Sequence, residues 1–169
     1  MGAPLRVHRR CGEPMFIISN HIAYSGMMIH DKVSGGAKIF PDSRWIDVAS
    51  ERSDGHWVEE EGRATKALLR KLKEDVFLIS PFRDVANHLN AIGKAHYFTR
   101  PQEQTGTIHL GGDPKKVGDK EWAAGKVNLL NVAVSRAKRT LLVVGNRTLW
   151  KEHSYFKVAA RILKVEKFG

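Results

Sequence analysis

Cysteine is nearly absent from the 169-residue chain, which contains only Cys11. A disulfide needs two cysteines, so an internal disulfide framework is excluded and a reducing, intracellular compartment is favoured. No apolar run approaches the roughly 18 residues that a membrane-spanning helix needs. Residues 1–6 also lack the apolar core of a secretory signal. We therefore expect a protein of the cell interior with no membrane partner.

The chain also lacks the parts of a complete nucleotide-hydrolysing site. No G-x-x-x-x-G-K-[ST] phosphate loop occurs, and neither Gly35-Gly36 nor Gly111-Gly112 matches it. No Asp-Glu pair follows an apolar strand, where it would hold magnesium. The histidines and the cysteine show no metal-ligand spacing, so we expect no metal site. The chain alone is not expected to hydrolyse a nucleoside triphosphate.

Acidic residues are fewer than basic residues. The chain has 28 Lys and Arg residues against 18 Asp and Glu residues, a formal net charge of +10. Such an excess favours a polyanionic partner such as nucleic acid, and the alternative is an ordinary solvated basic surface.

The hydrophobic pattern predicts an α/β domain built around a parallel sheet. Continuous apolar runs at 76–79 and 141–144 suit strands buried on both faces, and helical patterns separate them. The predicted helices are 14–24, 59–74, 81–92, 129–139 and 155–167, the predicted strands are 5–8, 44–48, 76–79, 107–110 and 141–144, and 111–125 is predicted as a loop. Ser80 is predicted to cap the helix that begins at Pro81. Sheets of this kind bind ligands at the carboxyl ends of their strands.

Arginines provide the candidate chemistry. Arg136 follows Val132 and Ala133 at helical spacing, which puts a guanidinium over an apolar stripe where it needs an anion. Spacing alone favours an internal carboxylate over a phosphate. Arg9 and Arg10 directly precede a predicted helix N-terminus, where two cations are unfavourable unless an anion joins them. Glu13 is the internal alternative to a bound anion.

Three segments resemble motifs of superfamily 1 helicases, in the order that this family shows. Leu5-Arg6-Val7-His8-Arg9-Arg10-Cys11 with Pro14-Met15-Phe16 is similar to motif IV, near residues 5–14. Ile79-Ser80-Pro81-Phe82-Arg83 resembles a strand-end segment of the family. Asn131-Val132-Ala133-Val134-Ser135-Arg136-Ala137-Lys138 resembles motif VI, at residues 131–138. The pattern is most similar to the Upf-like group, and the resemblance implies that residues 1–169 form one second RecA-like motor domain, of the P-loop NTPase type.

The resemblance implies roles in ATP binding and hydrolysis. Arg136 corresponds to the arginine finger that reaches the γ-phosphate of ATP, and Arg10 to a motif IV arginine directed at the same phosphate. Arg9 stands where many relatives carry an aromatic residue that stacks on adenine, and His8 where a glutamine is common. ATP with Mg²⁺ is then held mainly by a partner, the first RecA-like domain of the helicase.

The resemblance also implies contacts with single-stranded DNA or RNA. Ser80, Pro81 and Arg83 correspond to positions near the nucleic-acid backbone. Thr107 and His109 lie in a segment similar to the start of motif V, which couples nucleic acid to nucleotide. The chain then passes from His109 directly to Leu110, where relatives have a further loop and strand. If the natural protein has also lost this segment, the sheet lacks one strand.

Two other functions remain open from the sequence. A degenerate, non-catalytic nucleic-acid-binding module would use the charge of +10 without ATP. A purely structural domain of a larger assembly would use neither.

Overall fold

The computed structural model describes residues 7–8, 11–30, 42–72, 76–92, 95–96, 103–125 and 127–169. The strands are β1 Val7–His8, β2 Ile29–His30, β3 Arg44–Asp47, β4 Val76–Ile79, β5 Ala95–His96, β6 Glu103–His109, β7 Ala137–Gly145 and β8 Lys164–Lys167. The helices are α1 Met15–Ala23, α2 Glu59–Lys71, α3 Arg83–Asn90, α4 Val117–Gly125, α5 Val127–Arg136, α6 Arg147–Trp150 and α7 Phe156–Ile162.

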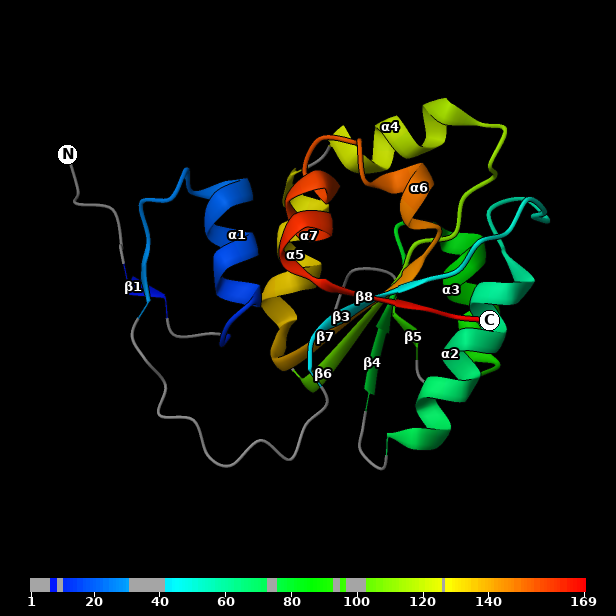
Figure 1. The fold of residues 1–169 in the computed structure, drawn as a ribbon, viewed down its shortest axis with the longest axis horizontal. Helices are drawn as coiled ribbons and strands as arrows, with labels where there is room; N and C mark the ends of the chain where they lie inside the picture. The colour runs from blue at the N-terminus through cyan, green and yellow to red at the C-terminus, as the bar shows by residue number, and fades with distance from the viewer. Residues whose placement is uncertain are drawn as a thin grey trace.

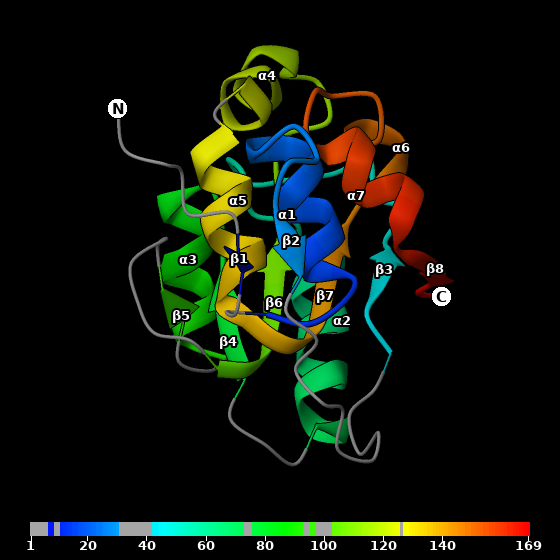
Figure 2. The same cartoon turned by 90° about the vertical axis from the view of Figure 1, so that its left-hand side faces the viewer.

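A parallel sheet of six strands forms the centre of the molecule, in the order β5-β4-β6-β7-β3-β8. Helices α2 and α3 cover one face, and α1, α5 and α7 cover the other (Figure 1). The short parallel pair of β1 and β2 lies beyond α1, and α4 lies across one end of the sheet (Figure 2). The predicted α/β class with a helix-flanked parallel sheet is therefore confirmed.

The two predicted buried strands form the middle of this sheet. Phe77, Leu78 and Ile79 of β4 are at most 3% exposed, and residues 140–145 of β7 are all buried. Both faces of these strands are covered by helices, which explains why their sequences run apolar without alternation. Trp45 of β3 is fully buried, and its indole Nε1 donates to the carbonyl of Gly145 at 2.9 Å.

Several of the predicted elements differ from those of the structure. Helix α3 begins at Arg83, because Ser80 Oγ accepts a bond from the Phe82 amide in the loop and does not cap the helix. Residues 117–125, predicted as loop, form α4, whose buried side includes Ala123 and Ala124. Helix α5 ends at Arg136, since β7 begins at the next residue. The predicted last helix stops at Ile162, and 164–167 instead pair with β3.

Strand β6 runs between β4 and β7 and pairs with both, so the sheet has no gap there. Directly after it, the Leu110 amide donates to the Val144 carbonyl at 2.9 Å, which extends the alignment of β6 with β7 by one residue. The passage from His109 to Leu110 is thus accommodated inside a continuous sheet. The loss of a strand from this sheet stays a prediction. Among the described residues, no helix combines the length and the apolar character that crossing a membrane requires.

Candidate functional site

Arg136 is the last residue of α5 and lies at the amino end of β7. Ala133, one turn earlier, is buried against the core, and this packing fixes the end of the helix. The Nε atom of Arg136 is buried, and no hydrogen-bond partner for it exists in the described part of the chain. No ion pair between Arg136 and a described carboxylate occurs either. The expected internal carboxylate partner is therefore not found in these residues.

The segment after the predicted motif IV arginines lies beside the end of motif VI. The Gly12 amide donates to the carbonyl of Lys138 at 3.0 Å, and Lys138 is two residues beyond Arg136. Two sequence segments more than 100 residues apart are thus joined at one end of the sheet. Arg9 and Arg10 lie outside the described residues, as does the side chain of His8. Their predicted roles toward ATP stay predictions.

A polar contact joins α1, which follows the first of these segments, to α5, which precedes the second. Ser19 of α1 is 2% exposed, and its hydroxyl donates to Asn131 Oδ1 of α5 at 2.5 Å. Cys11, at the entry to α1, is also buried, and burial raises the pKa of its thiol to about 12. Cys11 is therefore a protonated packing residue rather than a nucleophile.

The second predicted site lies at the opposite, carboxyl edge of the sheet. Ser80 and Pro81 follow β4 and are buried, while Arg83 is exposed at the start of α3. Thr107 and His109 of β6 are 2% and 0% exposed, so their side chains face the interior. Of the five residues predicted to contact nucleic acid, Arg83 presents its side chain to solvent.

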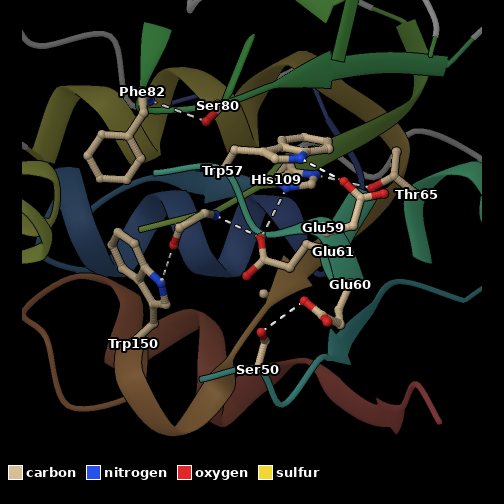
Figure 3. Close-up of polar contacts among 12 residues, drawn as sticks. Ser50, Trp57, Glu59, Glu60, Glu61, Thr65, Ser80, Phe82, His109 and Trp150 are labelled. Carbon is tan, nitrogen blue, oxygen red and sulfur yellow. Dashed lines mark hydrogen bonds and ion pairs between the residues drawn. The ribbon is translucent and has the colours of Figure 1, made fainter. Parts of the chain in front are cut away.

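His109 instead belongs to a buried polar network with α2 (Figure 3). Its Nδ1 lies 3.1 Å from Thr65 Oγ1, and its Nε2 lies 3.0 Å from Glu61 Oε2 without the alignment of a linear hydrogen bond. Glu61 Oε2 also accepts the Gly111 amide at 2.8 Å. Glu61 and Thr65 are 1% and 0% exposed. This network ties α2 to the loop that leaves β6.

Trp57 closes the network on its other side. Its ring stacks on that of His109, with centroids 5.4 Å apart and planes 9° apart, and its Nε1 donates to Glu59. This arrangement cannot be predicted from the sequence, because Glu61 occurs in an acidic run that is typical of a solvated helix start. The one available signal was its position three residues before Ala64 on the predicted apolar stripe of that helix.

His56 joins the two helices that begin at the carboxyl edge. Its Nδ1 lies 3.0 Å from Asp84 Oδ2 of α3, and its Nε2 lies 3.1 Å from Asp119 Oδ2 of α4. Its ring stacks on Phe82 with centroids 4.1 Å apart. Although burial raises the pKa of Asp84, hydrogen bonds from the backbone and ring of His56 outweigh it and hold this pKa below its ordinary value.

Within the described ranges, no group of three or more His, Cys, Asp or Glu side chains is arranged to hold a metal ion. Comparison of the sequence with protein-family models and with curated proteins gave no match.

Proposed function

We propose that this chain is the C-terminal, RecA-like motor domain of an ATP-dependent superfamily 1 helicase acting on DNA or RNA. The observation that carries the proposal is the buried Nε of Arg136, which has no hydrogen-bond partner in the described residues. A guanidinium placed in this way costs free energy unless an anion reaches it. A phosphate supplied by a neighbouring domain meets that requirement.

The convergence of two chain segments supports the same proposal. The bond from the Gly12 amide to the Lys138 carbonyl holds the stretch after Arg9 and Arg10 next to the stretch after Arg136. The Ser19–Asn131 contact ties α1, which follows the first stretch, to α5, which precedes the second. The family resemblance of residues 5–14 and 131–138 assigns both to one nucleotide.

The donor set suits a nucleoside triphosphate. When bound, ATP with Mg²⁺ supplies the phosphoanhydride bond whose hydrolysis drives movement, and a first motor domain with a phosphate loop holds most of it. In this proposal Arg136 and Arg10 donate to the γ-phosphate and offset its negative charge, and Arg9 and His8 lie toward the base. An arginine finger contributes about 10³–10⁵ to the rate of hydrolysis.

The test combines this chain with a first motor domain that carries the phosphate loop and measures ATPase activity with and without single-stranded nucleic acid. The expected result is nucleic-acid-stimulated hydrolysis that Arg136→Ala abolishes. Arg70→Ala, which changes an exposed arginine on α2, is the matched control. An Arg136→Ala chain that supports hydrolysis as fast as the parent refutes the assigned role.

A non-catalytic nucleic-acid-binding module is the second candidate, and the net charge of +10 favours it. This module binds nucleic acid with a steep dependence on salt and no response to ATP. Salt-dependent binding together with no ATPase in the combined assay selects this candidate.

A further inference from the structure

The imidazole of His56 lies between two carboxylates that come from different helices. Its Nδ1 lies 3.0 Å from Asp84 Oδ2 in the first turn of α3, and its Nε2 lies 3.1 Å from Asp119 Oδ2 in the first turn of α4. The ring stacks on Phe82 with planes 10° apart, and this stacking fixes the direction of both ring nitrogens. We call His56, Asp84 and Asp119 the histidine bridge.

The two contacts of the histidine bridge together require two ring protons. An ionised carboxylate only accepts hydrogen bonds, and a neutral imidazole has one N–H and one bare nitrogen. A neutral ring therefore donates to one carboxylate and turns a lone pair toward the other. The imidazolium carries N–H on both nitrogens and satisfies Asp84 and Asp119 at the same time. Histidine is the residue type that ordinarily exchanges this proton between about pH 5 and 8.

The Asp84 side of the histidine bridge is held by more than the ring. Asp84 Oδ2 also accepts the backbone amide of His56 at 2.9 Å, and this bond does not depend on the protonation of the imidazole. Although burial raises the pKa of Asp84, hydrogen bonds from the backbone and ring of His56 keep it below its ordinary value. When the ring loses one proton, the remaining N–H is therefore favoured on Nδ1, and Nε2 faces Asp119 as a bare nitrogen.

Helix α4 is the element that this change affects, because its buried face is small. Its buried side chains are Lys120, Ala123 and Ala124, whereas Val117 and Trp122 are exposed. Two alanine methyl groups bury little apolar area, so packing contributes little to the attachment of this helix. The helix lies across one end of the sheet (Figure 2), and the contact of Asp119 with His56 helps to attach it there.

Other charged groups surround the histidine bridge. They are Asp54 on the segment of His56, Arg83 on α3, Lys120 and Glu121 on α4, and Asp113, Lys115 and Lys116 in the loop ahead of α4. Among these residue types, none ordinarily titrates between about pH 5 and 8. His88 of α3 is the nearby imidazole outside the bridge. Its Nδ1 lies 2.9 Å from the carbonyl of Asp84 and its ring stacks on Trp57, so these contacts do not involve α4.

We propose that the histidine bridge is a pH-sensitive clamp, which ties α4 to α3 while the His56 ring carries two N–H protons and loosens α4 when Nε2 gives its proton to solvent. The side chain of His56 is 29% exposed, so water can take up this proton. The clamp uses none of the residues assigned to ATP, and the inference therefore does not depend on the proposed function.

Hydrogen exchange of the full chain, followed by mass spectrometry at about pH 5.5 and pH 8.5, measures how firmly α4 is held. Rates are corrected for the pH dependence of the chemical exchange step, and residues 117–125 of α4 are compared with residues 83–90 of α3. Relative to α3, we expect α4 to open about three- to fivefold more at the higher pH. The factor is small because the side chains of Asp84 and Asp119 are 40% and 41% exposed, and exposed ion pairs are weak. A ratio that is the same at both pH values overturns the proposal.

Asp119→Asn separates the charge of this side chain from its contact with His56. Asparagine can donate from Nδ2 to a bare Nε2 or accept with Oδ1 from a protonated one, so it fits both forms of the ring. We expect this variant to lose the pH dependence of α4 exchange. His88→Gln, the matched control, is expected to keep it. An Asp119→Asn protein with the full pH dependence of the parent overturns the proposal, as does a His88→Gln protein without it.

Nitrogen-15 NMR of the histidine-labelled chain follows the ring protons directly, since protonated and bare ring nitrogens have different chemical shifts. The signals of His56 are those that are missing from His56→Gln. With rising pH, we expect Nε2 to lose its proton while Nδ1 keeps its own, in the same pH range in which α4 exchange increases. A His56 ring that gives up the Nδ1 proton instead, or that becomes neutral without any change in α4 exchange, overturns the clamp.

Discussion

The buried contact between Glu61 and His109 makes the strongest prediction about stability. Replacing Glu61 by alanine removes the acceptor for the Gly111 amide and the carboxyl oxygen that lies 3.0 Å from His109 Nε2. The Gly111 amide and His109 Nε2 stay buried in the variant, because His109 is 0% exposed and Gly111 is buried. A buried polar group left without a partner costs about 1–3 kcal/mol. We expect Glu61→Ala, which leaves the buried Gly111 amide without its acceptor, to lower the free energy of unfolding by about 1–3 kcal/mol, a sizeable share of the roughly 5–15 kcal/mol typical of a domain.

Urea unfolding followed by circular dichroism measures this loss as a lower midpoint with an unchanged slope. Glu61→Gln keeps one acceptor oxygen and is expected to lose less than Glu61→Ala. Glu60→Ala is the control, because Glu60 is partly exposed and its hydroxyl partner Ser50, at 2.9 Å, is also near the surface. It is expected to cost less than about 1 kcal/mol. A Glu61→Ala protein as stable as Glu60→Ala would refute the role of this network.

Three further predictions concern packing and titration. Gly62→Ala places a methyl carbon against the Trp57 ring, closer than side chains can pack. Although alanine favours helices, we expect this variant to lower the free energy of unfolding by about 1–3 kcal/mol in urea. A gain in stability would contradict the packing of Trp57 on Gly62. Cys11, with its pKa raised to about 12, should resist a thiol reagent at pH 8 until the protein is unfolded, and fast labelling of the native protein would contradict its burial. The lowered pKa of Asp84 means that its contribution to stability is present at neutral pH and is lost as pH falls through its folded pKa. Asp84→Asn should therefore be less stable than the parent at pH 7 and converge with it in acid, whereas a constant difference would exclude the His56 contact as the cause.

The central strands and most helices could be predicted because their signals are local. Residues 76–79 and 141–144 are apolar throughout, and both became central parallel strands. The C-terminal strand could not be found in this way. Residues 164–167 consist of three charged residues and one valine, and all four are exposed. Their pairing with β3 therefore determines their structure. Periodicity alone cannot detect a strand whose partner β3 lies 120 residues away in sequence.

The candidate site also has features that could be predicted from the sequence and features that could not. The position of Arg136 over an apolar stripe could be predicted from spacing, whereas the internal carboxylate partner that spacing favours is not found among the described residues. The burial of His109 could not, because it depends on Glu61 and Trp57 arriving from a different segment of the chain. Motif resemblance identifies which residues share a role in a family, whereas solvent exposure depends on how this particular chain packs.

The proposed role of Arg136 is tested by the rate of ATP hydrolysis when this chain, as parent or as Arg136→Ala, is combined with a phosphate-loop motor domain and single-stranded nucleic acid. We expect stimulated hydrolysis with the parent and a loss of about 10³-fold or more with Arg136→Ala. Equal rates for the two proteins, with Arg70→Ala also equal, would contradict it.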